Sequence, residues 1–138
     1  MIQKAVYRLF SSAPIRSSSA ALKRMQEKYN IKDENLERYL EEQVILVDKK
    51  DNEVGQMSLL ESHLTENIFE KNLTHRAFSL LLFDDEYNLL LQKRSKIKIA
   101  FPEYWGNSCC SHPLANIPEE KETKDNLGAR RAGSRRAM

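Results

Sequence analysis

The residues best suited to chemistry lie in the segment Phe101–Leu114, which reads FPEYWGNSCCSHPL. Cys109 and Cys110 are adjacent, and His112 follows two residues after the second cysteine. A histidine or a metal ion near a thiol favours the thiolate, which makes a cysteine a nucleophile or an acid–base group. The alternative is that both cysteines are small, buried and inert, because free cysteine is among the most buried residue types. Residue type alone leaves both interpretations open.

The chain has three histidines, His63, His75 and His112. Imidazole nitrogens bind divalent metal ions, but a site needs several ligands that converge. The spacing of these histidines matches no compact motif such as HExxH, and the Cys-Cys-Ser-His run lacks the Cys spacing of a zinc finger. A lone histidine is more often a surface or core residue, so the sequence spacing gives only weak support for a metal site.

Two cations, Arg94 and Lys98, are four residues apart after a stretch of apolar residues. Fixed cations beside a loop bind phosphate or diphosphate groups. The alternative is a basic face in contact with solvent, which is the commoner role of such runs.

Composition limits the class of protein. The chain has 138 residues, of which 41% are hydrophobic and 30% charged, and this suits one globular domain. A net charge of +2 is too small to indicate a nucleic-acid partner. The sequence has no uninterrupted run of ~18 apolar residues, so no transmembrane helix is predicted. Two neighbouring cysteines cannot link distant segments, so a reducing compartment is expected.

The first 26 residues differ from the rest of the chain. They contain no Asp or Glu, and they carry scattered serines together with Lys4, Arg8, Arg16, Lys23 and Arg24. An acid-poor, Arg- and Ser-rich, amphipathic segment is typical of an organelle transit peptide. We therefore predict that residues 1–26 are disordered and direct import into the mitochondrion. The alternative is a disordered basic tail on a cytoplasmic protein.

Residues 27–138 show the pattern of an α+β domain. Leu36, Tyr39 and Leu40 have helical spacing after a possible N-cap at Asp33. The β-branched run Val44–Val47 predicts a strand, followed by a turn built from Asp51-Asn52 with Gly55 and then by a second strand.

The second half of the chain contains a clear hairpin pattern. Phe78–Phe83 predicts one strand, Asp84–Asn88 a polar turn and Leu89–Gln92 the return strand. The preceding stretch, Leu59–His75, predicts a loop with one helical turn. Near the end, Asp125 is expected to cap a helix that carries Arg130, Arg131, Arg135 and Arg136.

Three blocks carry a family resemblance: THRAFSLLLF, LLLQKRSKIKIAFPEYW and NSCCSHPL. In this order and spacing they resemble the type I isopentenyl-diphosphate Δ-isomerases, which have a Nudix-like fold. The resemblance runs from about Glu42 to the last residue. It implies that residues 27–138 are the N-terminal portion of a mixed-sheet α+β domain with flanking helices, incomplete at the C-terminus.

The resemblance also implies roles for particular residues. It implies that Cys110 is the catalytic thiol, and that His63, His75 and His112 bind a divalent metal ion (Zn, Mn or Mg). The family's diphosphate-binding positions match Arg94 and Lys98, and a weaker match falls on Arg136. In the family a Mg ion is associated with the diphosphate.

The implied reaction is the interconversion of isopentenyl diphosphate and dimethylallyl diphosphate by protonation and deprotonation of the alkene. The implied substrate is a small isoprenoid diphosphate, and the implied protein is a monomer with no nucleic-acid partner and no membrane span.

The sequence departs from the family pattern in several places. The family's domain continues beyond the position of Met138, and the two glutamates that complete its metal site, one of them the acid–base partner, would lie there. Leu59 stands where a lysine is common, and Gly133-Ser134 where Ala-Gln is common. We therefore expect these 138 residues alone to be inactive as an isomerase. The alternative function is a catalytically inactive truncated isoform or fragment of that family.

Overall fold

The computed structural model describes residues 23, 27, 34–96, 98 and 101–138. The predicted transit segment therefore lies outside the described residues, apart from Lys23. The chain divides into two compact units, Met1–His75 and Arg76–Met138, and each is described by itself.

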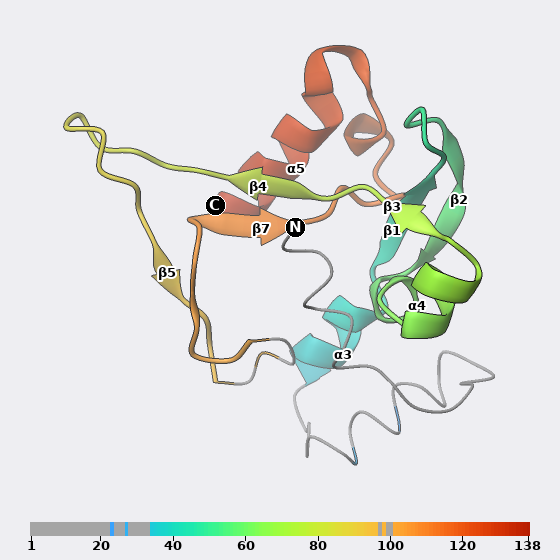
Figure 1. The fold of residues 1–138 in the computed structure, drawn as a ribbon. Coiled ribbons are helices and arrows are strands. Elements are labelled where there is room, and N and C mark those ends of the chain that lie inside the picture. The colour runs from blue at the N-terminus through green and yellow to red at the C-terminus, as the bar shows by residue number, and fades with distance from the viewer. Residues whose placement is uncertain (1–22, 24–26, 28–33, 97, 99–100) are drawn as a thin grey trace. The chain divides into compact units, whose positions relative to one another are not determined.

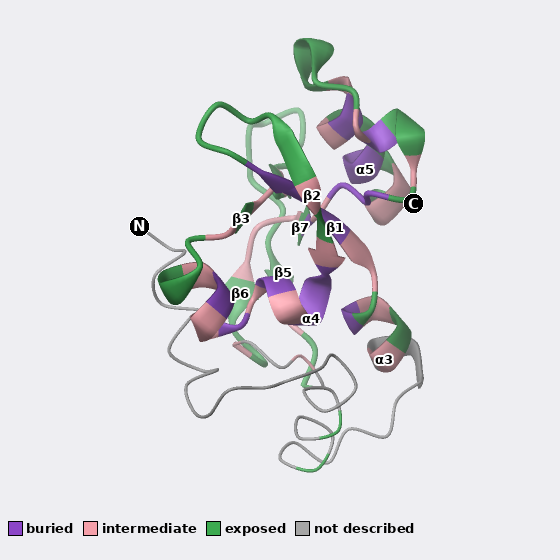
Figure 2. Cartoon of the chain, turned by 90° about the vertical axis from the view of Figure 1, so that its right-hand side faces the viewer, coloured by how far each residue is buried: buried purple, intermediate pink, exposed green. Residues whose placement is uncertain are grey.

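The first unit is built around a three-stranded antiparallel sheet (Figure 1). Its elements are α3 (Glu34–Leu40), β1 (Gln43–Val47), β2 (Glu53–Ser58), α4 (Leu59–Ser62), the π-helical turn η2 (Glu66–Glu70) and β3 (Thr74–His75). Strand β1 is central and pairs with β2 on one side and β3 on the other. Four consecutive residues of β1, Val44–Val47, are buried, as Figure 2 shows in purple. A β-branched strand buried on both faces gives this unit its core.

The second unit has short antiparallel strand pairs and one longer helix. Its elements are β4 (Phe78–Leu80), β5 (Gln92–Lys93), β6 (Trp105–Gly106), β7 (Cys109–Ser111), the 3-10 turns η3 (Pro118–Glu120) and η4 (Lys124–Asn126), and α5 (Leu127–Ala137). Strand β4 pairs with β7, and β5 pairs with β6. Helix α5 packs along β4 and β7 (Figure 1).

Both units contain helices and antiparallel strands, which confirms the α+β class at this level. Among the described residues, no helix has the length and apolar character that a bilayer crossing requires.

The predicted hairpin is wrong in its length. The turn forms, because both carboxylate oxygens of Asp84 accept hydrogen bonds, including those from the backbone and side chain of Asn88. However, the two arms meet only in an isolated bridge at the tip. Ser108 lies between them, because its Oγ accepts from the Leu82 N–H and donates to the Leu90 carbonyl, both at 2.8 Å. The strand predicted over Phe78–Phe83 therefore pairs with β7 instead.

Three smaller predictions also need correction. Gly55 lies inside β2 opposite Leu46 rather than in the turn, where Asp51 takes the positive φ of 64°. The segment Leu59–His75 contains the π-helical turn η2 in addition to the expected helical turn. Helix α5 begins after Asn126, and Asp125 does not cap it, because Asp125 itself adopts a left-handed conformation in η4.

Candidate functional site

The adjacent cysteines have different surroundings because they lie on one strand. Successive side chains of a β-strand point to opposite faces. In β7, Ser111 is buried and bonded to Arg136 of α5, so Cys109, two residues earlier, shares the face toward that helix. Cys110 lies on the opposite face and is exposed. Both thiols are free, so the strand separates one partly covered cysteine from one open to solvent.

The exposed thiol has neighbours on the paired strand. Cys110 lies directly opposite Ser79 of β4 in the strand register. The Ser79 hydroxyl oxygen is 3.2 Å from the Cys110 Sγ, and it accepts a hydrogen bond of 3.0 Å from the side-chain amide of Asn107.

A buried ion pair holds the segment that follows β7. Glu120 of η3 is 3% exposed, and Arg135 of α5 donates to both of its carboxylate oxygens through Nε and an Nη atom. Glu120 also accepts the Leu114 N–H at 2.8 Å, and Arg135 donates to the His112 carbonyl at 3.3 Å. This pair therefore ties the turn after His112 to α5.

Sequence reasoning missed the role of Glu120 and Arg135. Between Glu120 and Arg135 the chain passes through a loop, the 3-10 turn η4 and the first two turns of α5, so no single helical or strand period relates them. The signal that was available is weak: Pro118 favours the start of a helical turn, and this places Glu120 at its end.

Two further arginines of α5 also bond to their own unit. Arg136 donates from Nε to the Ser111 hydroxyl at 3.0 Å, and Arg131 donates to the Glu119 carbonyl at 3.0 Å. The predicted diphosphate residue Arg136 is thus beside the strand of Cys110, but its contact is with a side chain on the α5 face of that strand.

The other two predicted diphosphate residues lie on the segment between β5 and β6. Arg94 is half-buried and organises this segment: its backbone bonds to Glu103 and Tyr104, and its Nε donates to the Phe101 carbonyl at 3.2 Å. Lys98 is half-buried on the same segment, and its N–H donates to the Ser95 carbonyl.

In the first unit, His63 is fixed in one tautomer. It ends α4, and its Nδ1 is 2.8 Å from the Leu59 carbonyl oxygen. A carbonyl only accepts, so Nδ1 carries the hydrogen and Nε2 keeps its lone pair. This is the arrangement that orients metal-binding histidines. This hydrogen bond uses the backbone carbonyl of residue 59, so it forms with a leucine side chain at that position.

His75 lies close to His63 in the same unit. The two ring centroids are 4.6 Å apart with an interplanar angle of 50°. Burial, together with the positive charge that His63 would carry, lowers the pKa of His75 to about 4. Burial also lowers the pKa of His63, against the effect of its hydrogen bond to Leu59. Both rings are therefore neutral near pH 7, the form in which imidazole binds a metal ion.

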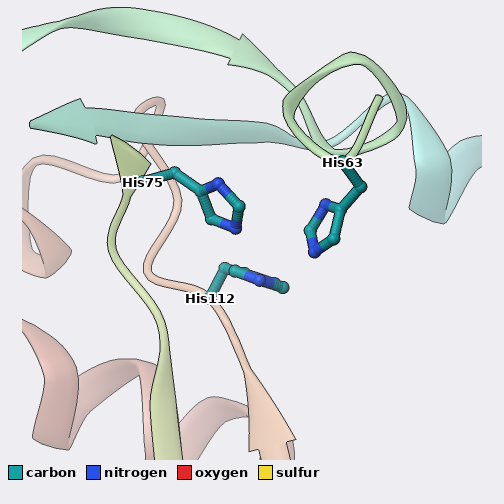
Figure 3. A group of neighbouring side chains, drawn as sticks. All are labelled: His63, His75 and His112. Carbon is teal, nitrogen blue, oxygen red and sulfur yellow. The ribbon is translucent and has the colours of Figure 1, made fainter. Parts of the chain in front are cut away.

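The third predicted ligand, His112, follows β7 in the second unit. Figure 3 draws its side chain with those of His63 and His75. Within the described part of the chain, these three histidines are a group that could hold a metal ion. The donor chemistry fits, since neutral imidazole is a common ligand of zinc and other transition ions.

Similar proteins are known for this chain, although no family model matches it. The chain is 51% identical over 104 residues to "Isopentenyl-diphosphate Delta-isomerase 1" of Mesocricetus auratus, which covers 75% of this chain and 45% of the relative. It is 50% identical over 99 residues to "Isopentenyl-diphosphate Delta-isomerase II, chloroplastic" of Arabidopsis thaliana, covering 71% of this chain and 34% of the relative.

A human relative has a similar identity and coverage. The chain is 50% identical over 97 residues to "Isopentenyl-diphosphate delta-isomerase 2" of Homo sapiens, covering 70% of this chain and 42% of the relative. The chain thus spans less than half the length of each of these curated relatives. The resemblance drawn from the motifs is confirmed, and over about three quarters of its length the chain is homologous to isopentenyl-diphosphate Delta-isomerases.

Proposed function

We propose that this chain is part of an isopentenyl-diphosphate Δ-isomerase with a Nudix-like fold. The observation that carries the proposal is the placement of Cys110, the exposed thiol of the Cys-Cys-Ser-His motif, on the open face of β7. The names of the relatives and their identity of about 50% support it.

The proposed chemistry moves a double bond by one carbon. A proton adds to the terminal carbon of the alkene and leaves a tertiary cation. Loss of a proton from the neighbouring CH₂ group then forms the new double bond. An alkene is a weak base, so a well-placed acid shielded from water is needed. We propose Cys110 as one of the two groups that exchange these protons, with a glutamate as the other.

We further propose that His63, His75 and His112 hold one divalent ion, namely zinc, manganese or magnesium. The low pKa values of His63 and His75 support this, because neutral rings bind without first losing a proton. When bound, the ion would supply positive charge that favours the anionic form of acid–base groups beside it.

The diphosphate is proposed to bind Arg94 and Lys98, with Arg136 as a further candidate and a magnesium ion as counter-charge. Guanidinium and ammonium groups pair well with phosphate oxygens. Arg94 and Lys98 are both half-buried, and the bonds of the Arg94 backbone and side chain to residues 101, 103 and 104 support an ordered site. The protein is proposed to act as a monomer.

A chimera tests the activity. Residues 27–138 are joined to the C-terminal part of the Mesocricetus auratus relative, and conversion of isopentenyl diphosphate is measured. We expect the chimera to be active and the Cys110→Ala variant to lose at least about 10²-fold in rate. The matched variant Cys109→Ala, changed on the other face of β7, should keep most of the activity. An inactive chimera, or equal activity of both variants, would sink the proposal.

Zinc titration tests the metal site on the 138-residue chain. Each single His→Ala change at positions 63, 75 and 112 should weaken zinc binding, because each removes one of three ligands. Circular dichroism of every variant controls for folding. Unchanged affinity in all three variants would argue against a shared site.

Mitochondrial import is proposed for the first 26 residues. The absence of acidic residues supports it, and relatives named as chloroplastic are found among the similar proteins. Residues 1–26 fused to a fluorescent reporter should reach mitochondria; a diffuse cytosolic signal would refute the proposal and favour the cytoplasmic alternative.

A further inference from the structure

We infer that Ser79 is a positioning residue for the Cys110 thiol and that Asn107 aims the Ser79 hydroxyl at the sulfur. The inference rests on the proposed function, in which Cys110 exchanges a proton with the substrate. It starts from three side chains of the second unit: Asn107 donates to Ser79 at 3.0 Å, and Ser79 lies 3.2 Å from the Cys110 Sγ.

The direction of the second hydrogen bond follows from the first. The amide nitrogen of Asn107 only donates, so it takes one lone pair of the Ser79 oxygen. The hydroxyl still has its single hydrogen to donate, and the Cys110 sulfur is the acceptor within reach. An N–H···O–H···S sequence of this kind is polarised in one direction, and each bond strengthens the next.

The strand register keeps these groups in place. Ser79 and Cys110 are directly opposite each other in the β4–β7 pair, flanked by the pairs Phe78–Ser111 and Leu80–Cys109. Side chains directly opposite in an antiparallel pair are about 4.5–5.5 Å apart at Cβ, close enough for two short side chains to bond. Ser79 therefore reaches the sulfur without any rearrangement of the backbone.

This arrangement suits a thiol that must release and recover a proton. When Cys110 gives its proton to the alkene, the sulfur becomes an anion on an exposed strand. A hydroxyl already pointing at it donates a charge-assisted hydrogen bond, the stronger class of such bonds. The same contact holds the sulfur in one direction while it is protonated. Cys109 is opposite Leu80 and has no such donor across the strand.

The test measures alkylation of Cys110 by iodoacetamide on the 138-residue chain carrying Cys109→Ala, at a pH at which the thiol is already ionised, so that the rate reports the surroundings of the sulfur. A hydrogen bond donated by Ser79 stabilises the thiolate and lowers its intrinsic nucleophilicity. We therefore expect Ser79→Ala to speed alkylation about threefold. Asn107→Ala should speed it less, and Ser79→Thr should keep the original rate.

The second cysteine provides the control for structure. On the chain carrying Cys110→Ala, the alkylation rate of Cys109 should not respond to Ser79→Ala, whereas loosening of the β4–β7 pair would change it. In the active chimera, Ser79→Ala should lower kcat with little change in KM. An unchanged Cys110 rate would overturn the inference, as would equal effects on both cysteines. Because alkylation needs no substrate, an inactive chimera would refute the proposed function without affecting this result.

Discussion

Burial sets the charge of His75 over the physiological pH range. Its pKa lies at about 4, against 6.5 for a free imidazole, because the ring is desolvated and faces His63. Two imidazoles this close cannot both be protonated at low cost, whereas both are ready as neutral ligands. The burial that keeps both rings neutral therefore makes the metal-free chain sensitive to acid.

We predict that the metal-free chain loses stability as pH falls from about 6.5 to about 4. The folded state disfavours the protonated ring, so its stabilisation is present above the pKa of the unfolded chain and is lost as pH falls toward the folded value. Urea unfolding with a chelator present should show wild type losing about 1–2 kcal/mol more than His75→Gln between about pH 7 and about pH 5. An identical loss in both would contradict the low pKa.

At the scale of elements, a buried ion pair holds the parts of the second unit together, whereas a buried apolar strand does so in the first unit. Glu120 and Arg135 join η3, α5 and the turn after β7, which carries His112. Breaking a buried ion pair leaves one charge without compensation, which costs more than the pair itself contributes. The placement of the proposed catalytic strand therefore depends on two residues that are not expected to touch substrate.

We predict that Arg135→Ala destabilises the chain by about 2–3 kcal/mol, because it leaves Glu120 buried without its cation. Arg131→Ala, changed one helical turn earlier, is the matched control. Arg131 is exposed and donates to the Glu119 carbonyl, so a loss of about 0.5 kcal/mol or less is expected. Urea midpoints measure both. Equal effects of the two changes would contradict the anchoring role of Glu120.

The two glycines of α5 should respond in opposite directions to alanine. A Cβ on Gly128 would collide with the backbone of Glu120, whereas one on Gly133 would make an ordinary contact of 3.8 Å with the Phe78 ring. Gly133→Ala should therefore stabilise by about 0.5–1 kcal/mol through helix propensity, and Gly128→Ala should destabilise by about 1–3 kcal/mol through overpacking. Thermal unfolding of both variants checks this; destabilisation by both would show that α5 has no room at either position.

Elements with a local signal were predictable, and elements decided by distant contacts were not. Strand β1 follows from its β-branched run, and the turns at Asp48 and Asp84 follow from aspartate–asparagine pairs four residues apart. The hairpin failed because a hydroxyl from Ser108 replaces its ladder bonds. In the proposed site, the three histidines and Cys110 were predicted from the family resemblance, whereas Glu120, Ser79 and Asn107 make contacts that no sequence period encodes.

The two units of the chain differ in how their cores are made. Most buried apolar residues belong to the first unit, including all of Val44–Val47 together with Leu59, Leu60 and Leu64. Among the described residues of the second unit, the buried apolar side chains are Pro113, Leu114, Ala115 and Ala132. Residues 81–93 of that unit are all exposed, with large apolar side chains such as Phe83 and Leu90 among them. Local stability should follow this division, because it depends on buried contacts and protected hydrogen bonds.

We predict that hydrogen exchange separates the two units. Backbone amides of Val44, Ile45 and Leu46 should exchange slowest, because these residues are buried and paired with β2, and Leu46 is also paired with β3. Amides between Leu81 and Leu91 should exchange at least about tenfold faster, since their few backbone bonds are open to solvent and local opening costs little there. Mass spectrometry of peptides from the exchanged chain measures both segments in one sample. Equal protection would mean that the exposed arms are held by contacts as strong as those of β1, and it would contradict a core concentrated in the first unit.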